Sequence, residues 1–362
     1  MKRLVCFHLL NDYSGSPKVL KLLLDGLCNK GVEIDLYTSN TNGVLDELKC
    51  NKGLKMYTYN YKFSNKMSVT LLRYSWIQML SFFWSIRYVF SKDVVFFINT
   101  LLPIGPALAG RMIGKRVVYH YHENADVKGA FYKSLAVGMQ MLAHEIICVS
   151  QHQSQFLKRK DIVTLVPNAL PDIFIKKISP NIGSAFQRKR VLMLGSLKEY
   201  KGTVEFYRLA SVLPQYKFEI VINDTQKNIN AFVEEKKIQQ PANMIVYSRQ
   251  SDVSRFYNES SLVLNLSNKE LFVETFGLTA LEAMSAGLPV IVPTVGGIAE
   301  MVKDGVNGYK IDVQNLDKIK QTIDRVLSDE SLYKMLATNA LKSSKNFSET
   351  KMINKISEII WK

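Results

Sequence analysis

The sequence predicts an α/β fold with two doubly wound parallel-sheet domains in succession, and three observations lead to this prediction. Short apolar runs bounded by polar turns recur along the chain, with segments of helical length between them; this pattern is typical of a parallel sheet covered by helices. The pattern stops in the polar, basic stretch KKISPNIGSAFQRKR and then restarts. With 362 residues, the chain is long enough for two domains that each bury their own core.

Five apolar runs in the first half and six in the second are the expected strands. They read LVCFHLL, VEIDLYTS, VVFFINT, RVVYHYHE and EIICVSQ, then RVLMLGS, KFEIVIND, NMIVYS, SLVLNLS, LPVIVPT and GYKID. We therefore expect an N-terminal domain over residues 1–170, a linker over 171–188 and a C-terminal domain over 189–345. The last helix, over 346–362, is long enough to pack back on the first domain. Such sheets bind ligands at the carboxyl ends of their strands, so a cleft shared by the two domains is the expected site.

The charge balance indicates an anionic partner. Apolar residues make up 47% of the chain and charged residues 22%, which is typical of a folded globular protein, and the formal net charge is +15. Such a charge favours nucleic acid, an anionic lipid surface or a phosphorylated ligand. Because Lys and Arg are scattered and form no long block, we expect no nucleic acid, and a membrane surface or a phosphate-rich ligand fits better.

Cysteine spacing and apolar run length indicate a cytoplasmic protein. The four cysteines show no pairing at disulfide-framework or zinc-site spacing, so we expect reduced thiols. The first residues predict a β-strand and not a signal peptide, because the apolar run is interrupted by His8 and lacks a cleavage site. The run from Val94 to Gly110, as long as any uncharged run in the chain, has 17 residues and two prolines, whereas a spanning helix needs about 20 apolar residues.

The stretch ETFGLTALEAMSAGLPVIV predicts an anion site at the start of a helix. The helix is expected to begin near Phe276 or Gly277 and to end at Gly287 before the strand LPVIV. Gly277 permits close approach of a ligand to the backbone, and the N–H groups of Gly277 and Leu278 would form a seat for a phosphate.

Two glutamates flank this helix start. Glu274 precedes the helix and Glu282 lies more than one turn inside it, so the two carboxylates would contact different parts of one extended ligand. Carboxylates suit sugar hydroxyls, which donate hydrogen bonds to them. The alternative, from the residues alone, is that Glu274 is a loop charge and Glu282 a solvated helix residue.

The same stretch, followed by VGGIAEMVKDGVNGY, resembles the E-x7-E region of glycosyltransferase family 4. The resemblance covers nearly the whole second domain. It implies the GT-B fold, in which two Rossmann-like domains face each other across a cleft, and a retaining transfer of sugar from a nucleoside diphosphate. It also implies that Glu274 lies beside the donor sugar, that Glu282 holds the ribose, and that the turn through Phe276, Gly277 and Leu278 binds the donor diphosphate.

VLMLGSLKEYKG resembles the family's strand and loop that end in Lys-Gly. The resemblance implies that Lys201 is the cation on the donor phosphates and that Gly195 allows close approach. An ammonium there would stabilise the departing nucleoside diphosphate, where negative charge develops. The family usually has Arg where this chain has Ser196, so a second phosphate cation is either missing or supplied by Lys198 or Arg249.

Two stretches of the first domain resemble family landmarks. NDYSGSPKVL resembles the loop after the first strand, where the family has a Gly pair and this chain has only Gly15; the alternative is an ordinary strand-to-helix turn. VVYHYHENADVK resembles a strand that ends in His and an acidic residue, which implies that His122 lies near the transferred sugar, next to Glu123. The alternative is a structural histidine.

The segment from Ser68 to Phe90 is unusually aromatic and contains Arg73 and Arg87. One interpretation is a helix buried in the first domain. The other is a basic amphipathic surface for lipid headgroups or a lipid-linked acceptor.

Together these features predict a glycosyltransferase. We expect it to be cytoplasmic, peripheral at the inner face of the plasma membrane, and to transfer sugar to a hydroxyl acceptor, a lipid-linked glycan intermediate of bacterial surface polysaccharide. Catalysis is assigned to His122, Glu274 and Lys201. We expect no cofactor and no metal, because no Asp-x-Asp pattern occurs and the five histidines lack ligand spacing. The alternatives are a nucleotide-sugar epimerase with the same architecture and a noncatalytic basic protein that docks on membranes or nucleic acid.

Overall fold

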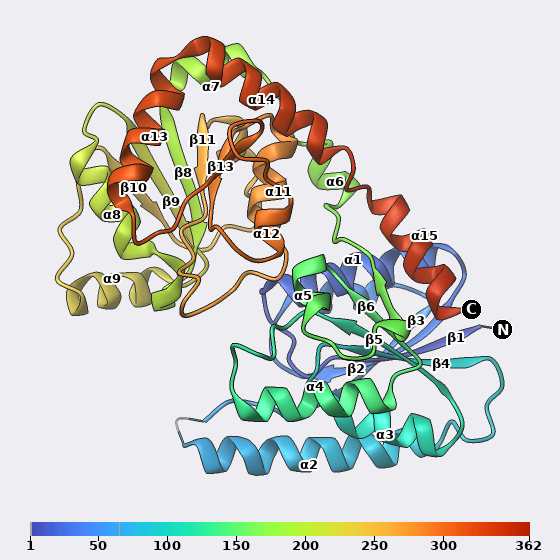
Figure 1. The fold of residues 1–362 in the computed structure, drawn as a ribbon. Coiled ribbons are helices and arrows are strands. Elements are labelled where there is room, and N and C mark those ends of the chain that lie inside the picture. The colour runs from blue at the N-terminus through green and yellow to red at the C-terminus, as the bar shows by residue number, and fades with distance from the viewer. Residues whose placement is uncertain (1, 65) are drawn as a thin grey trace. The chain divides into compact units, whose positions relative to one another are not determined.

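A computed structural model describes residues 2–64 and 66–362, and the chain divides into two compact units (Figure 1). One unit holds Met1–Ala169 together with Glu349–Lys362, and the other holds Leu170–Ser348. Each unit is a parallel sheet covered by helices, so the predicted α/β class with two doubly wound domains is confirmed.

The first unit contains a seven-stranded sheet in the order β3-β2-β1-β4-β5-β6-β7, and every neighbouring pair is parallel. The strands are β1 Arg3–Phe7, β2 Glu33–Ser39, β3 Leu54–Tyr59, β4 Val94–Asn99, β5 Arg116–Tyr121, β6 Glu145–Cys148 and β7 Val163–Leu165. The helices are α1 Gly15–Asn29, η1 Val44–Cys50, α2 Met67–Ile86, α3 Ile104–Met112, α4 Ala130–Leu142, α5 Gln151–Gln155, η2 Lys160–Ile162 and α15 Glu349–Ile360.

The last helix, α15, packs against α1 in the first unit (Figure 1). A methyl group added at Gly26 of α1 would come within 2.3 Å of Ile353 Cδ1, so the absence of a side chain sets the close approach of the two helices. Arg116 at the start of β5 donates a hydrogen bond of 3.2 Å to the carbonyl of Ile359 and fixes the end of α15 to the sheet.

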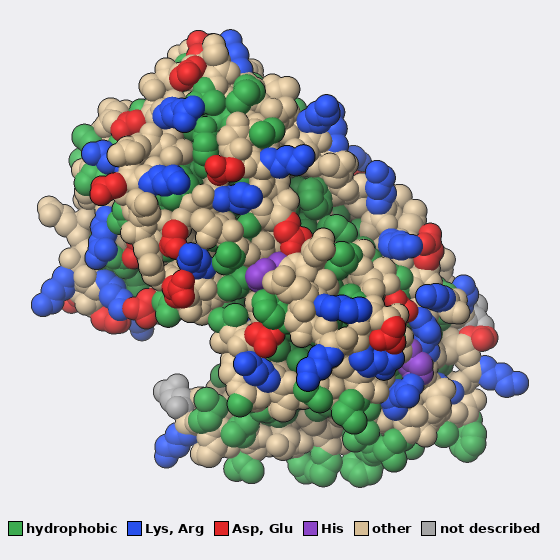
Figure 2. All heavy atoms as spheres, viewed as in Figure 1, with side chains coloured by type: hydrophobic (Ala, Val, Ile, Leu, Met, Phe, Trp, Pro, Cys, Tyr) green, Lys and Arg blue, Asp and Glu red, His purple; other side chains and the backbone are tan. Residues whose placement is uncertain are grey.

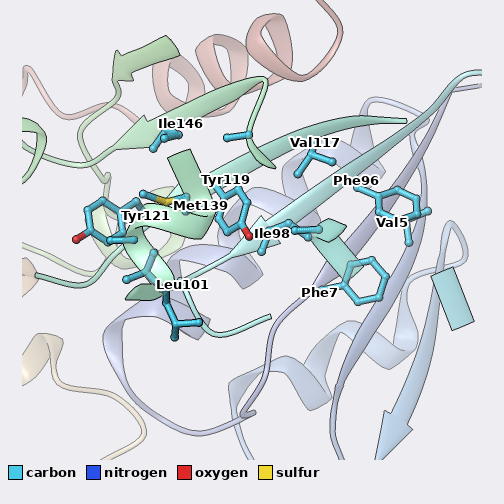
Figure 3. Packing of buried hydrophobic residues seen from close by; sticks show 14 of the residues in the cluster. Val5, Phe7, Phe96, Ile98, Leu101, Val117, Tyr119, Tyr121, Met139 and Ile146 are labelled. Atoms are coloured by element: carbon cyan, nitrogen blue, oxygen red, sulfur yellow. The ribbon is translucent and has the colours of Figure 1, made fainter. Parts of the chain in front are cut away.

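Alternation along the strands divides this sheet into two faces. Odd-numbered residues of β5, such as Tyr119 and Tyr121, join a buried cluster with Met139 of α4, and Figure 3 shows these side chains packed together. The even-numbered residues point to the opposite face. His120 lies there in the middle of the sheet, and His122 follows it just after the strand ends.

The second unit contains a six-stranded parallel sheet in the order β10-β9-β8-β11-β12-β13. The strands are β8 Arg190–Gly195, β9 Lys217–Ile222, β10 Met244–Tyr247, β11 Leu262–Leu264, β12 Val290–Val292 and β13 Gly308–Lys310. The helices are α6 Asp172–Ile175, α7 Ile182–Arg188, η3 Glu199–Lys201, α8 Thr203–Val212, α9 Gln226–Glu235, α10 Ser254–Asn258, α11 Leu278–Ser285, α12 Gly297–Glu300, α13 Leu316–Ser328 and α14 Glu330–Ser344.

The segment 171–188, expected as a linker, is folded into the second unit. It contains α6 and α7, and the Asn181 side chain caps α7 by accepting a hydrogen bond of 3.0 Å from the Ser184 N–H. Phe186 is buried with its ring 5.2 Å from that of Tyr333 on α14. Polar composition indicated a linker here, but this buried apolar side chain is what ties the segment to the domain.

No helix in the described part of the chain combines the length and the apolar character needed to cross a membrane.

Candidate functional site

The second unit has a topological switch point at β8. The chain runs from β8 to β9 on one side and later returns to β11 on the other side of β8. In open parallel sheets, ligands bind outside the carboxyl ends of the strands where the order reverses. The loops that follow β8 and β11 therefore define the candidate site of this unit.

These two loops are joined by an ion pair between Lys201 and Glu274. Lys201 Nζ donates a hydrogen bond to Glu274 Oε1, and Ser267 Oγ donates a second, of 2.8 Å, to the same oxygen. The side chains of Lys201 and Glu274 are only 25% and 13% exposed. The fold thus brings together two candidate site residues that lie 73 positions apart in the sequence.

Two aromatic rings support the ammonium group of Lys201. Tyr200 and Phe272 stack with their ring centroids 4.4 Å apart, and Lys201 Nζ lies 5.6 Å and 5.3 Å from these centroids. The Asn268 N–H donates a hydrogen bond of 2.8 Å to the Tyr200 carbonyl and ties the two loops together. Cation–π attraction and the ion pair therefore fix the same ammonium group from different directions.

The environment of Glu274 keeps its carboxyl group ionised. Burial alone would raise the pKa of Glu274, but the charge of Lys201 and hydrogen bonds from Lys201, Ser267 and Asn265 lower that pKa below its usual value of 4.5. A permanently ionised carboxylate accepts hydrogen bonds from hydroxyl groups over the whole neutral pH range.

Helix α11 begins next to this ion pair. Gly277 precedes the first helical residue with a φ of 97°, and a Cβ atom there would lie 2.4 Å from Ile298 Cγ1. The Glu274 carbonyl accepts a hydrogen bond of 2.9 Å from the Gly297 N–H. The first N–H groups of a helix have no acceptor within the helix and carry partial positive charge, so this end of α11 and the Lys201 ammonium both suit an anion.

Glu282 lies on α11, where the Tyr257 hydroxyl donates a hydrogen bond to its Oε2. Burial raises the pKa of Tyr257 well above its usual value, and the charge of Glu282 adds to this effect. The tyrosine therefore remains a hydrogen-bond donor. It fixes the direction of the Glu282 carboxylate, which the sequence pattern alone did not reveal.

Gly195 and Phe276 offer a ligand no exposed side chain. Gly195 is the last residue of β8, and its carbonyl accepts a hydrogen bond of 2.9 Å from the Asn223 N–H. The Phe276 side chain is buried, with its ring 5.8 Å from that of Phe347. A ligand at the turn before α11 would therefore meet the main chain of Phe276 and not its ring.

Ser196 stands where the family usually has arginine, and Lys198 and Arg249 are the two cations that could replace that arginine. Ser196 follows β8, and its hydroxyl is a buried oxygen without a hydrogen-bond partner in the part of the chain described. Lys198 is exposed in the loop that carries Lys201, with its ammonium 5.8 Å from the Tyr200 ring centroid. Arg249 follows β10 and donates a hydrogen bond of 2.8 Å to Asn223 Oδ1. Lys198 is thus the cation on the same loop as Lys201, whereas Arg249 lies two strands away in the sheet.

In the first unit, the partly buried His122 belongs to a polar cluster at the carboxyl ends of β1, β4 and β5. Asn99 Oδ1 accepts a hydrogen bond of 3.1 Å from His122 Nε2, and Asn99 Nδ2 donates one of 2.9 Å to His8 Nδ1. This pairing leaves Nδ1 of His122 as the acceptor nitrogen of the ring. The ring centroids of His120 and His122 are 4.0 Å apart.

The histidines of this cluster are neutral at pH 7. Burial lowers the pKa of His8 to about 4 and that of His120 to about 3, and burial also holds the pKa of His122 well below 6.5 with a smaller contribution from the other two rings. A neutral His122 can accept a hydrogen bond but supplies no charge.

Glu123 and Gly15 have different surroundings. The Glu123 carboxylate is buried and accepts a hydrogen bond of 3.1 Å from the Leu101 N–H, so it braces the loop after β4. Gly15 is the exposed first residue of α1. The Asp12 carboxylate accepts hydrogen bonds from the Ser14 N–H and hydroxyl at 2.8 and 2.5 Å. A carboxylate beside this helix start offsets its positive charge, which favours a hydroxyl-bearing ligand over a phosphate at Gly15.

No group of three or more His, Cys, Asp or Glu residues within residues 2–64 and 66–362 is arranged to hold a metal ion.

Comparison with known proteins identifies the second unit. Residues 174–343 match the model of the family described as Glycosyl transferases group 1. This segment is a group 1 glycosyltransferase domain. The chain is also 30% identical over 166 residues to an uncharacterized glycosyltransferase of Methanocaldococcus jannaschii. This alignment covers 45% of the chain and 42% of that protein. The match thus spans less than half of that relative's length.

Two solved structures share the fold of both units. One is sucrose-phosphate synthase of Thermosynechococcus elongatus, with a TM-score of 0.78, 16% identity and coverage of 99% of this chain and 98% of that chain. The other is HepE of Anabaena in complex with UDP and glucose, with a TM-score of 0.78, 17% identity and 99% coverage of both chains. These similarities confirm the predicted GT-B fold, with the group 1 domain as its second Rossmann-like half.

Proposed function

We propose that this protein is a glycosyltransferase that moves a sugar from a nucleoside diphosphate to a hydroxyl acceptor. The observation that carries the proposal is the Lys201–Glu274 ion pair beside the N-terminus of α11, at the carboxyl ends of β8 and β11. This arrangement brings together a cation, the first N–H groups of α11, which have no acceptor within the helix, and an ionised carboxylate. A nucleoside diphosphate sugar offers a matching anion and sugar hydroxyls.

On this proposal the donor diphosphate binds to the Lys201 ammonium and to the N–H groups of Gly277 and Leu278. Negative charge grows on the diphosphate as the bond to the sugar breaks, and these fixed positive groups stabilise it at that moment. The same groups supply the charge for which other transferases use a metal, so we propose that no metal is required. Addition of EDTA should leave the rate unchanged.

Glu274 and His122 are proposed to act on the transferred sugar, and Gly15 to approach it through its backbone. Glu274 is ionised, and His122 is neutral with Nδ1 as its acceptor, so both accept hydrogen bonds from sugar hydroxyls. Neither is arranged as a proton donor. We propose that the donor phosphate assists removal of the acceptor proton and that the product retains the anomeric configuration.

The acceptor is proposed to be a lipid-linked glycan intermediate of surface polysaccharide, met at the inner face of the plasma membrane. The net charge of +15 supports a position beside an anionic surface. A hydroxyl acceptor on a lipid carrier would then be presented where the protein binds.

A thermal-shift screen of UDP-, GDP- and ADP-sugars tests this function first, with UDP-sugars as the first choice because HepE is solved with UDP. A ligand that binds only the folded state raises its stability by about 2.7 kcal/mol at a hundred times its Kd. We expect one nucleotide class to raise the unfolding temperature, and NMR of the product formed with an acceptor to show retention. Stabilisation by no nucleotide sugar would contradict the proposal.

Replacing Asn99 by aspartate is expected to make the reaction sensitive to acid. A carboxylate at this position would favour protonated rings of His8 and His122 and raise their pKa values. Because a protonated ring loses its acceptor nitrogen, activity should fall as the pH drops through the raised pKa, whereas the wild-type rate stays level down to about pH 6. If the pH–rate profiles of the wild type and Asn99→Asp were superimposable, a role of the neutral His122 ring would be excluded. Asn99→Leu cannot hydrogen-bond to His8 or His122 and is the control for the loss of ring positioning.

Replacing Glu282 by alanine is expected to weaken donor binding without slowing the chemical step. Loss of a charged hydrogen bond to the ribose costs about 1.5–3 kcal/mol, or roughly a 10- to 100-fold rise in Kd. Because the ribose is remote from the reacting bond, kcat should change little. Tyr257→Phe removes only the hydroxyl that orients Glu282 and should raise Kd by less than Glu282→Ala does. An unchanged Kd for Glu282→Ala in calorimetry would contradict a contact between Glu282 and the ribose.

A further inference from the structure

Helix α2 has a buried face of mixed polarity and an exposed apolar face. The buried face consists of Tyr74, Ile77, Gln78, Ser81 and Ser85. The exposed side chains Leu72, Trp76, Met79 and Phe83 follow one another at intervals of four, three and four residues, which places them along one line on the helix. We call these four residues the outer stripe of α2.

The outer stripe is large and continues past the helix. The exposed fractions are 72% for Leu72, 59% for Trp76 and 61% for Phe83, and Phe90, just after the helix, is 94% exposed. In the space-filling view, hydrophobic side chains gather along the surface over α2 (Figure 2). Isolated exposed apolar side chains are ordinary, but a contiguous apolar surface marks an interaction site.

The neighbouring helices extend this surface. The Gly105 N–H of α3 donates a hydrogen bond of 3.0 Å to Gln78 Oε1, and a Cβ at Gly105 would lie 2.1 Å from the Gln78 carbonyl oxygen, so α3 packs directly on α2. Helix α4 packs in turn on α3. Exposed apolar residues on these two helices include Leu108, Met112, Val137 and Met141. The apolar surface is therefore formed by a layer of helices and not by one projecting loop.

The sequence segment that contains α2 carries charge of one sign. Between Glu47 and Asp93, residues 48–92 contain eight Lys or Arg and no Asp or Glu. Lys62, Lys66 and Arg73 are exposed around the start of α2, and Arg73 Nη1 donates a hydrogen bond of 3.0 Å to the Lys62 carbonyl. Basic side chains thus border one end of an aromatic and aliphatic surface.

We propose that this surface docks on an anionic lipid bilayer, with α2 lying in the plane of the membrane. A bilayer interface accepts Trp, Phe and Leu side chains at the level of the headgroups, and each Lys or Arg near an anionic surface gains about 1 kcal/mol. A second copy of the chain seated on this face would instead bring two basic regions together. The proposal rests on the first unit and does not depend on the glycosyl transfer proposed for the protein.

Vesicle sedimentation tests the proposal with the full chain and no nucleotide. We expect the wild-type protein to bind vesicles of phosphatidylcholine and phosphatidylglycerol at least about tenfold more tightly than vesicles of phosphatidylcholine alone, and to lose affinity as salt is raised. The double variant Trp76→Gln/Phe83→Gln should lose about tenfold or more in binding. Val212→Gln/Ile245→Gln, which changes two exposed apolar residues of the other unit, should bind like the wild type.

A second double variant tests vesicle binding even if Trp76→Gln/Phe83→Gln proves unstable. Lys66→Glu/Arg73→Glu alters only exposed charges and should abolish the preference for anionic vesicles. Equal binding by the wild type and both α2 variants, or no binding by the wild type, would overturn the proposal. So would light scattering that shows a dimer lost on Trp76→Gln/Phe83→Gln, because the surface would then be an interface between copies.

Discussion

Replacing Lys201 with alanine is expected to lower kcat by about 10²- to 10³-fold, the range found when one preorganised electrostatic group is removed from an active site. The ammonium is held by Glu274 and by the Tyr200 and Phe272 rings, so no reorganisation is needed when charge develops on the diphosphate. Release of nucleoside diphosphate, followed at saturating donor, measures the effect. Lys227→Ala, an exposed lysine on α9, is the matched control and should leave kcat unchanged.

The same substitution should change the ionisation of Glu274. Without Lys201, burial becomes the dominant influence and the pKa of Glu274 rises above its usual 4.5. In the wild type, the lowered pKa stabilises the fold above pH 4.5, and this contribution is lost as the pH falls through the pKa of the folded state. Lys201→Arg keeps the charge and should retain part of the activity. A wild-type rate in Lys201→Ala would show that the ion pair is only structural.

Replacing Gly277 with alanine is expected to lower the free energy of unfolding by about 2–5 kcal/mol, because two costs add. A non-glycine residue in the left-handed region costs about 1–2 kcal/mol, and overpacking of a buried site costs about 1–3 kcal/mol. Gly277 has a φ of 97°, and its new methyl group would lie 2.4 Å from Ile298 Cγ1. Urea unfolding followed by circular dichroism measures the change, and donor affinity should fall because the start of α11 must shift.

Gly305→Ala separates the two costs. Gly305 also has a positive φ, of 71°, but an added methyl group there would meet no atom within 4 Å. We expect a loss of only about 1 kcal/mol and unchanged donor affinity. If the two glycine variants were equally stable, the contact between Gly277 and Ile298 would not constrain the site.

Strand positions could be predicted where a strand is buried on both faces. The runs at β4 and β8 are continuously apolar and were assigned from the sequence, whereas β3, with the sequence LKMYTY, and β7, with the sequence VTL, were missed. Both missed strands lie at the edges of their sheet. Edge strands keep polar residues on the side that faces solvent, so the apolar signal is weak there.

The main residues of the candidate site could be proposed because their spacing is local, but their partners could not. The turn from Glu274 to Gly277 lies within one short stretch, and its resemblance to a family also pointed to Lys201. Ser267, Tyr257 and Asn99 hold the proposed groups in place, yet each contacts its partner only after the strands have assembled. A single Ser, Tyr or Asn carries no periodic signal that distinguishes this role from that of a surface residue.

Helix α2 shows the opposite case, in which the sequence left two interpretations open. An aromatic segment predicts either a core helix or a membrane-facing helix. The structure supports parts of both, since Tyr74 and Ile77 are buried while Trp76 and Phe83 are exposed on the same helix. This division cannot be read from hydrophobicity alone, because the buried face also carries Gln78, Ser81 and Ser85 while the exposed face is apolar.

A crystal structure of the protein with a bound nucleoside diphosphate would show whether Lys201 and the start of α11 form the donor site. We expect diphosphate oxygens within hydrogen-bonding distance of the Lys201 ammonium and of the N–H groups of Gly277 or Leu278, with the ribose hydroxyls on Glu282. A diphosphate bound away from the start of α11, with Lys201 and Glu274 still engaged only with each other, would contradict this expectation.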